Sequence, residues 1–315
     1  MLPDSLVIGT RRSRLALWQA GYVRQLLQKA CPGLTITLQC VTTRGDRITN
    51  RPLSAIGGKG LFTEEIERGL YGHTLDLAVH SLKDMPSELP RGLILGAVPE
   101  RGNEKDAFVS VRYQSLADLP EGAVVGTSSL RRKAQLLHLR PDLVVSDLRG
   151  NVDTRLSRLD EGKYDAIILA AAGLIRLGLE SRITSLLPPD EFLPAAGQGA
   201  LAIEAREGDK PVLTLLRTIH DARTAAAVTA ERAYAAAIGG SCQIPAGAFA
   251  SWQGDDLVLR AFIASPDGRT CLSRSASSPA ADAQKLGYEL GKDMLKGGGE
   301  ALLRSLRTTI KGDIL

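Results

Sequence analysis

Aromatic side chains make up only 4% of this 315-residue chain, and long apolar runs are absent from it. Because single-stranded nucleic acid is bound by stacking its bases on aromatic rings, the composition argues against that kind of surface. The longest apolar run, Ala166 to Ile175, contains Gly173 and is far too short to cross a bilayer. The first residues lack a basic segment followed by an apolar one, so we expect no secretory signal and a cytoplasmic protein.

Cysteine and histidine are also scarce. No pair among Cys31, Cys40, Cys242 and Cys271 has the Cys-x-x-Cys spacing, and the four histidines form no HxxxH or HxH group. We therefore expect neither a disulfide framework nor a metal site.

The formal net charge of +4 is unevenly distributed along the chain. Residues 1–60 contain nine Arg or Lys and two acids, a balance of +7, whereas residues 61–126 contain six and eleven, a balance of −5. Two interpretations stay open at this point: compensating surface charge, or basic residues that line one cavity.

Strand and helix patterns alternate through most of the sequence. A strand at Leu6–Gly9, a helix at Leu15–Lys29 and a strand at Leu34–Val41 begin a first βαβ cycle, and a second cycle follows a polar connector at 99–106. The rhythm predicts two α/β domains with mainly parallel, doubly wound sheets around a cleft that holds the ligand.

The rest of the chain changes character. A strand at Ala200–Ala205 is predicted to return to the first domain, while a helix at Thr224–Ala237 and hairpins over 246–275 predict a third, smaller α/β domain. We place domain 1 at 1–99 and 200–217, domain 2 at 105–193 and domain 3 at 222–315.

Three turns between a strand and a helix carry hydroxyl or backbone N–H donors beside arginine: Thr10–Ser13, Thr127–Arg132 and Leu148–Asn151. A helix N-terminus attracts anions through its unpaired N–H groups and its dipole, and arginine adds a planar fork that fits carboxylate or phosphate. One such turn is weak evidence because Ser and Thr are ordinary N-caps. Three of them, together with Arg155 and Arg176, indicate a ligand that carries several anionic groups.

The segment Gly57-Gly-Lys-Gly60 is not a phosphate-binding P-loop, because it lacks that spacing and no strand directly precedes it. Lys59 on this glycine-rich loop is either a contact of a mobile lid or a solvated lysine.

Asp84 follows a predicted strand, Leu75–Ser81, and lies beside Lys83. In an arginine-lined cavity a single carboxylate is the natural group to bind an ammonium, stabilise a cationic intermediate or move a proton. Taken alone, the segment is better explained by an aspartate that begins a turn before Pro86. His80 is interpreted as a buried or supporting histidine and not as a base.

Cys242 follows two glycines and Ser241, and precedes Pro245 by three residues, on a loop that favours access to its thiol. The other cysteines are interpreted as inert small hydrophobic residues. Because no partner histidine follows in a protease arrangement, a covalent tether is a better interpretation of Cys242 than an acyl-transfer nucleophile.

Eight ordered segments carry a resemblance to a known family: GTRRSRLALWQ from Gly9, GGKGLF from Gly57, AVHSLKDMP from Ala78, GTSSLRR from Gly126, LRGNVDTRL from Leu148, YDAIILAAAGL from Tyr164, LPAAGQGALAIE from Leu193 and GGSCQIP from Gly239. The chain resembles the porphobilinogen deaminase family over nearly its whole length. The resemblance implies two domains similar to periplasmic binding proteins and a third that bears the cysteine. It also implies a cytoplasmic monomer whose substrate is porphobilinogen, with neither nucleic acid nor a membrane as a partner.

The resemblance further implies a role for each site residue. Cys242 holds a dipyrromethane cofactor through a thioether, and Asp84 assists the loss of ammonia and stabilises cations. The groups that bind cofactor and chain carboxylates are Lys83, Thr127, Ser129, Arg131, Arg132, Arg149 and Arg155. The groups implied to bind the incoming substrate are Arg11, Ser13, Arg176 and Lys59, with Arg149 and Arg155 shared. Four condensations and a hydrolysis then release hydroxymethylbilane.

Three positions depart from the family pattern: Arg14 stands where proline is common, Ser241 where glycine is usual, and Ala55 where some relatives have lysine. None removes a predicted catalytic group. The alternative hypothesis is a two-lobed anion-binding module without chemistry, which the α/β pattern alone supports equally. Such a module gives no reason for the loop around Cys242.

Overall fold

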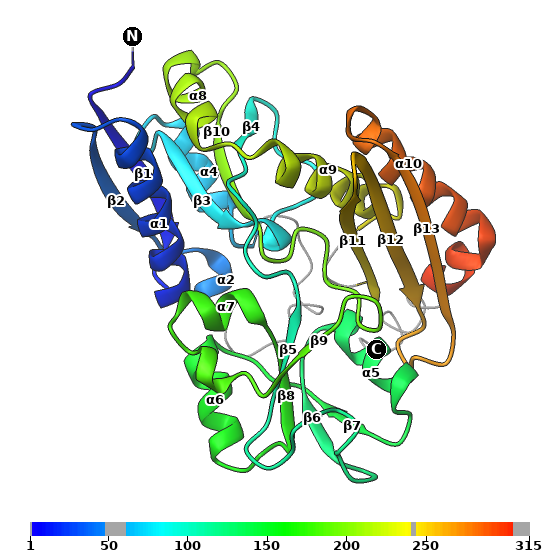
Figure 1. Cartoon of the computed structure of the whole chain (residues 1–315). Helices are drawn as coiled ribbons and strands as arrows, with labels where there is room; N and C mark the ends of the chain where they lie inside the picture. Colours follow the sequence, from blue (N-terminus) through cyan, green and yellow to red (C-terminus); the bar gives the residue numbers. More distant parts are fainter. Residues whose placement is uncertain (1, 48–60, 241–243, 305–315) are drawn as a thin grey trace. The chain divides into compact units, whose positions relative to one another are not determined.

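The computed structural model describes residues 2–47, 61–240 and 244–304. The chain separates into two compact units, Met1–Asn103 with Gly197–Ala225, and Glu104–Ala196 with Ala226–Leu315. Figure 1 shows the path of the chain through three sheets, two of five strands and one of three. The predicted three-domain boundaries stay a prediction.

The sheet of the first unit has the strand order β2-β1-β3-β10-β4. Its strands are β1 (Ser5–Arg11), β2 (Thr35–Val41), β3 (Leu77–Ser81), β4 (Leu93–Ala97) and β10 (Leu201–Arg206). Its helices are α1 (Arg14–Ala30), α2 (Arg44–Arg47), α4 (Glu64–Tyr71), α8 (Lys210–Leu216) and two short 3-10 helices, η1 (Leu82–Asp84) and η3 (Arg217–Ile219).

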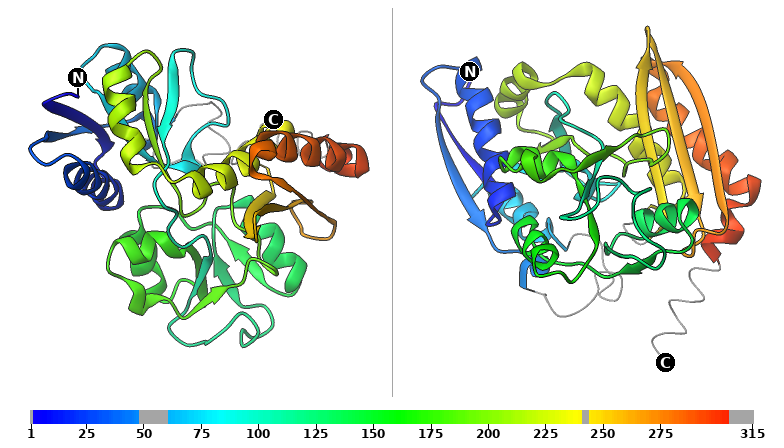
Figure 2. Two further views of the ribbon diagram at one scale, coloured as in Figure 1. Left: turned by 45° about the horizontal axis from the view of Figure 1, so that its top comes forward. Right: turned by 60° about the horizontal axis from the view of Figure 1, so that its bottom comes forward.

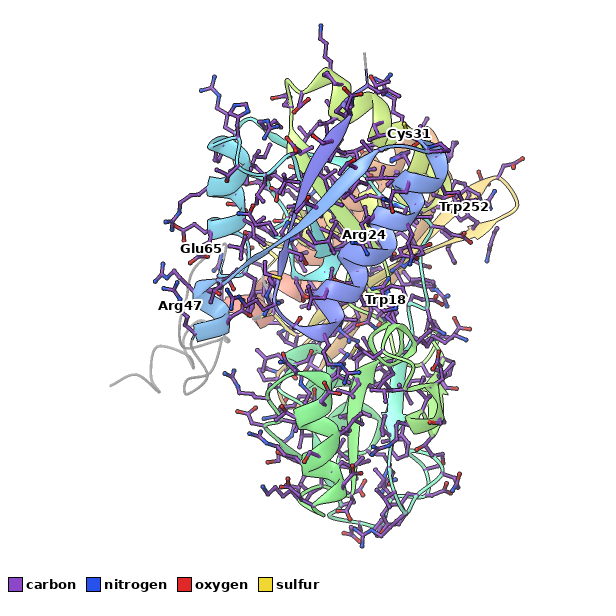
Figure 3. The ribbon with its side chains drawn as sticks, turned by 90° about the vertical axis from the view of Figure 1, so that its left-hand side faces the viewer. Trp18, Arg24, Cys31, Arg47, Glu65 and Trp252 are labelled. Atoms are coloured by element: carbon purple, nitrogen blue, oxygen red, sulfur yellow. The ribbon has the colours of Figure 1, made fainter. Side chains whose placement is uncertain are left out.

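Side chains alternate between the two faces of this sheet. Ile8, Val79 and Ile203 pack with α1 and α8, whereas Val7 and Ala78 pack with Ile66 and Leu70 of α4 on the other face. The exposed side of α1 carries Trp18, which stacks on Tyr22 with ring centroids 5.3 Å apart (Figure 3). Two helical layers therefore bury both faces, as expected for a doubly wound fold.

The five-stranded sheet of the second unit has the order β7-β6-β8-β5-β9. Its strands are β5 (Asp106–Val109), β6 (Val124–Gly126), β7 (Val144–Ser146), β8 (Ala166–Ala170) and β9 (Ser185–Leu187). Leu136 of α5 (Leu130–Leu139) packs on one face, and the other face is covered by α6 (Val152–Asp160) and α7 (Ala171–Arg176), which precede the short η2 (Glu180–Arg182).

The third sheet is an antiparallel meander, β11 (Ala246–Gln253), β12 (Asp256–Ala264) and β13 (Cys271–Pro279). One face packs on α9 (Ala222–Ala237) and α10 (Ala283–Met294), which is flanked by the short η4 (Ala280–Asp282) and η5 (Leu295–Gly299) (Figures 1 and 2). On the other face, Phe262 and Ala264 of β12 pack on Ala134 of α5. The predicted third, smaller α/β part of the chain is confirmed by this sheet and its helices.

The predicted α/β fold is confirmed, with one correction to the sheets. Each five-stranded sheet contains one strand that runs against its neighbours: β10 pairs antiparallel with β3 and β4, and β5 pairs antiparallel with β8 and β9. Each reversed strand follows directly where the chain passes from one unit to the other. The predicted return of Ala200–Ala205 is confirmed by β10, while β5 begins at Asp106, where the sequence predicted only a polar connector.

Within the described residues, no helix has both the length and the apolar character that a membrane span requires.

Candidate functional site

A small pocket lies in the first unit, beside the carboxyl ends of β1 and β3. It offers about 60 Å³ to solvent, and three predicted site residues, Arg11, Ser13 and Asp84, line it together. Because β1 and β3 are parallel, the loops that follow them leave the sheet at the same edge. The fold thus groups these three residues in one place.

Short-range hydrogen bonds fix the turn after β1. Ser13 is the N-cap of α1, and its Oγ accepts a hydrogen bond from the backbone N–H of Ala16 at 3.2 Å. Thr10 Oγ1 donates to the carbonyl oxygen of Ala16 at 3.1 Å. After β3, the turn η1 ends at Asp84, whose side chain is exposed at the pocket.

Arg11 is held by an acid and an aromatic ring. Its Nε donates to Asp46 Oδ1 at 3.1 Å, and its guanidinium carbon lies 4.2 Å from the centroid of the Phe62 ring. Burial disfavours the charged form of Asp46, but hydrogen bonds from Arg11 and Thr43 outweigh it and hold the pKa of that carboxyl below its usual value. The guanidinium is therefore orientated before any ligand arrives.

Lys83, next to Asp84, points to a buried amide. Its Nζ donates to Gln198 Oε1 at 3.2 Å, and the backbone oxygen of Gln198 accepts from Arg101 Nε at 2.8 Å. Gln198 is fully buried. Lys83 is half-buried, and its side chain is held by Gln198, in the segment that precedes β10.

Two acidic residues lie behind the pocket, and neither was predicted from the sequence. His80, which lines the pocket, places Nε2 3.1 Å from Oε2 of Glu204, a residue of β10 with 0% exposure. Glu67 of α4 is buried on the same face of the sheet, and burial first, then the charge of Glu204, raises the pKa of Glu67. The expectation that His80 is a buried, supporting histidine fits these contacts, and its role stays a prediction.

Predicted residues of the second unit gather at the carboxyl edge of β6 and β7. Thr127 is buried directly after β6, and its Oγ1 accepts from the backbone N–H of Ser129 at 3.2 Å. Ser129 is the N-cap of α5, and its Oγ accepts from the backbone N–H of Arg132 at 3.4 Å. The first turn of α5 therefore directs backbone N–H groups and the positive end of the helix dipole toward this edge.

Arg131 and Arg132 point inward, to one buried carboxylate. Arg131 Nη2 and Arg132 Nη2 each lie 2.7 Å from an oxygen of Asp106, which has 0% exposure. Burial lowers the pKa of Arg131, and the charge of Asp106 opposes that shift. Among the described residues these two guanidinium groups share one carboxylate, which leaves one buried positive charge in excess; an anion at the N-terminus of α5 would offset it.

Arg149 and Arg155 lie near the same edge, after β7 and in the first turn of α6. Both are half-buried, and Arg155 Nε donates to the carbonyl oxygen of Gly150 at 2.8 Å. Arg176 ends α7, one short helix away from the edge. The sequence predictions for Lys59 and Cys242, and the departures at Ala55 and Ser241, lie outside the described residues.

Comparisons with known proteins match one family along most of this chain. Residues 6–214 match the family described as "Porphobilinogen deaminase, dipyromethane cofactor binding domain", and residues 225–296 match "Porphobilinogen deaminase, C-terminal domain". A porphobilinogen deaminase of Ralstonia nicotianae is 55% identical over 308 residues, which cover 96% of this chain and 92% of that protein. One of Roseiflexus castenholzii is 54% identical over 300 residues, covering 95% and 99%.

The chain belongs to the porphobilinogen deaminase family. The predicted resemblance is thereby confirmed, and with it a transferase of porphyrin biosynthesis that contains a dipyrromethane cofactor binding domain. Among solved structures, the chain is similar to a putative methionine-binding lipoprotein of Bacillus subtilis, with 14% identity, a TM-score of 0.43, and coverage of 70% of this chain and 92% of that one. A nutrient binding protein of Burkholderia cenocepacia bound to methionine gives 15% identity, a TM-score of 0.42, and coverage of 67% and 90%.

The donor set of the second unit fits the family's cofactor. A dipyrromethane carries four carboxylates on two pyrrole rings, so it needs hydrogen-bond donors and positive charge. The N-terminus of α5, the half-buried Arg149 and Arg155, and the excess charge at Asp106 supply both. When bound, dipyrromethane supplies the pyrrole carbon that accepts the first substrate.

Four acidic residues of these sites were not predicted from the sequence: Asp46, Glu67, Asp106 and Glu204. Two of them gave a signal, because Glu204 interrupts the apolar run Leu201–Ala205 and Asp106 directly precedes the apolar Ala-Phe-Val. A charged residue inside a predicted buried strand requires a partner, and the sequence alone does not name that partner.

Proposed function

We propose that this chain is a hydroxymethylbilane synthase. It joins four porphobilinogen molecules head to tail, with the loss of one ammonia at each addition, on a dipyrromethane primer attached to Cys242. Hydrolysis then releases hydroxymethylbilane. The observation that carries the proposal is the 53–55% identity to porphobilinogen deaminases over nearly the whole chain.

Asp84 is the catalytic residue of the proposal. Its carboxylate is exposed at a pocket that Arg11 and Ser13 also line. Arg11 and Ser13 bind the carboxylates of the incoming substrate, with Arg176 and Lys59 as further contacts. Asp84 faces the aminomethyl group and stabilises the positive charge that develops when ammonia leaves. Guanidinium groups alone would repel that charge, so the reaction requires a carboxylate here.

The second unit holds the carboxylates of the cofactor and the growing chain. The residues assigned to binding these carboxylates are Thr127, Ser129, Arg131, Arg132, Arg149 and Arg155, together with Lys83. Each charge-assisted hydrogen bond contributes roughly 1.5–3 kcal/mol, so several of them retain an intermediate through four additions. Arg131 and Arg132 attract the carboxylates through the excess positive charge beside Asp106 as well as through direct contact with them.

The proposal includes a monomer in the cytoplasm and three domains, at 1–99 with 200–217, at 105–193, and at 222–315.

The intact mass of the purified protein tests the proposal. We expect an excess over the apo-chain that corresponds to two condensed pyrrole units, because the tether is covalent. Cys242→Ser is expected to lose this excess, whereas the matched control Cys271→Ser, at a half-buried thiol of β13, retains it. An unmodified, reduced chain that cannot load porphobilinogen would instead support the anion-binding module.

A further inference from the structure

His80 and Glu204 form a buried pair that the reaction as proposed does not use. Glu204 pairs with Ala78 across the antiparallel ladder of β10 and β3, and His80 pairs with Ala202, so the two side chains are diagonal neighbours on one face. His80 is 6% exposed and Glu204 is fully buried. A carboxylate only accepts hydrogen bonds, so the 3.1 Å contact assigns the proton to Nε2 of the imidazole.

Nδ1 is the ring nitrogen of His80 that Glu204 does not engage. His80 lines the same pocket as Asp84, and among the described residues its Nδ1 has no hydrogen-bond partner. A histidine whose one nitrogen is held by a buried carboxylate, and whose other nitrogen is available in a pocket, has the arrangement of an orientated base.

Two buried carboxylate oxygens reinforce this assignment. Oε1 of Glu204 and Oε1 of Glu67 lack a hydrogen-bond partner among the described residues. An unpaired buried polar atom destabilises a fold, so each one in a native structure requires an explanation. The carboxyl group in contact with His80 is that of Glu204, whereas burial raises the pKa of Glu67.

The chemistry proposed above releases a proton at each addition. The aminomethyl group reacts as its ammonium, –CH2–NH3+: its C–N bond breaks, the electron pair leaves with NH3, and the positive charge stays on the methylene-pyrrole. The aminomethyl carbon then bonds to a pyrrole carbon of the acceptor, and the C–H bond at that carbon breaks and returns its electron pair to the ring. One proton is therefore released per addition, and Asp84 must remain ionised for the next one.

The geometry points to His80, held by Glu204, as the group that takes up this proton at Nδ1 in the Asp84 pocket. The imidazolium that forms keeps its Nε2–H on the Glu204 carboxylate, which stabilises the new charge. The proton then passes to solvent, and His80 returns to its starting tautomer. This inference rests on the proposed function and adds a second catalytic residue to it.

The charged groups around His80 come from every element packed against it. Glu204 faces it from β10 and Glu67 from α4, while Asp84 follows its own strand and Arg11 extends from β1 into the pocket. From α1 and its N-cap, the residues that line the pocket are uncharged: Ser13, Leu15, Ala16 and Gln19. The acid next to the imidazole is thus Glu204, and Arg11 is already engaged by Asp46.

Three variants of the holoenzyme test the inference: His80→Gln, Glu204→Gln and the control Glu67→Gln. We expect kcat to fall about 100-fold in His80→Gln, within the range of acid–base residues, with KM within about twofold. Glu204→Gln is expected to lower kcat about tenfold, because Glu204 orientates the ring and stabilises its charge but does not itself take up the proton. Glu67→Gln makes the same chemical change beside the pair and is expected to keep kcat within about threefold.

Nitrogen NMR of the imidazoles supplies a readout that does not depend on turnover. The chain has four histidines, so His80→Gln identifies the His80 signals by difference. We expect the Nε2–H tautomer in the parent protein and its loss as the dominant form in Glu204→Gln. A proton on Nδ1 at neutral pH, or a His80→Gln variant with unchanged kcat and pH profile, would overturn the inference.

The two failures can be told apart. If the parent protein lacks the added mass and makes no tetrapyrrole, the proposed function fails. If the parent carries the mass and turns over, but kcat of His80→Gln and Glu204→Gln equals that of Glu67→Gln, only the His80 assignment fails.

Discussion

Asp84, Asp46 and Glu67 are carboxyl groups of one unit in three different surroundings. Asp84 is exposed at the pocket, Asp46 is held ionised by Arg11 and Thr43, and Glu67 is buried against Glu204. The same functional group is therefore open to a pocket in one place, anchors a guanidinium in the second and is a buried acid in the third. Its environment decides which of these it becomes.

Asp84→Asn is expected to fold and to carry the cofactor mass, yet to lose most turnover. The amide keeps the size of the side chain but removes the negative charge that stabilises the cationic intermediate, so kcat should fall at least about 100-fold. Steady-state kinetics with porphobilinogen, together with the intact mass, measures both effects. Near-normal rates would remove Asp84 from its assigned role.

Glu67→Gln is expected to change how stability depends on pH. Because the pKa of Glu67 is raised in the folded protein, the unfolded chain loses this proton near the ordinary value of 4.5 while the folded chain still keeps it. The free energy of unfolding therefore falls as pH rises from 4.5 toward the folded pKa, and then levels off. Urea unfolding at a series of pH values should show a smaller fall for Glu67→Gln; identical slopes would contradict the raised pKa.

At the scale of elements, α5 connects the turn at Thr127–Ser129 to the third sheet. Its N-terminus carries Ser129, its first turn places Arg131 and Arg132 on Asp106, and its later residue Ala134 packs on Phe262 of β12. Gly268, in the β12–β13 turn, has a φ of +71° and lies so close to α5 that an added Cβ would meet the carbonyl oxygen of Ala134 at 2.5 Å. The position of the turn that holds Ser129 thus depends on packing against β12.

Asp106→Asn is expected to lower the free energy of unfolding by about 3–5 kcal/mol. The change leaves two buried guanidinium groups without their carboxylate, and an uncompensated buried charge is strongly destabilising. As a matched control, Asp142→Asn removes a solvent-accessible partner of Arg140 and should change stability far less than Asp106→Asn does. Chemical denaturation of both variants checks this, and equal effects would contradict it.

At the scale of the whole chain, two segments of the first unit that are far apart in sequence are joined by hydrogen bonds. The backbone N–H of Gly102 donates to the carbonyl oxygen of Gly199 at 3.1 Å, and that of Arg101 donates to Thr224 Oγ1 at 3.1 Å. Gly199 has a φ of +85°, and a Cβ on it would lie 2.7 Å from the carbonyl oxygens of Gly102 and Asn103. Only glycine allows this close approach.

Gly199→Ala is therefore expected to destabilise the protein by at least about 2 kcal/mol, since it combines a left-handed backbone with a clash against main chain. Gly208→Ala is the control, because an added Cβ there meets nothing within 4 Å. Thermal unfolding should show a lower Tm for Gly199→Ala alone. A Gly199→Ala variant as stable as its control would show that the backbone can separate at this contact.

The sequence by itself determined the family, the α/β order of strands and helices, and the local turns. Ser13 and Ser129 cap helices within three residues of themselves, and Asp84 follows its strand directly, so short-range rules were sufficient to place them. The tertiary structure alone decided the rest. His80 and Glu204 are 124 positions apart, and Arg132 and Asp106 are 26 apart, yet each pair meets because a strand of reversed direction enters the sheet. A buried charge shows in the sequence that it needs a partner, but only the pairing of distant strands determines which partner it finds.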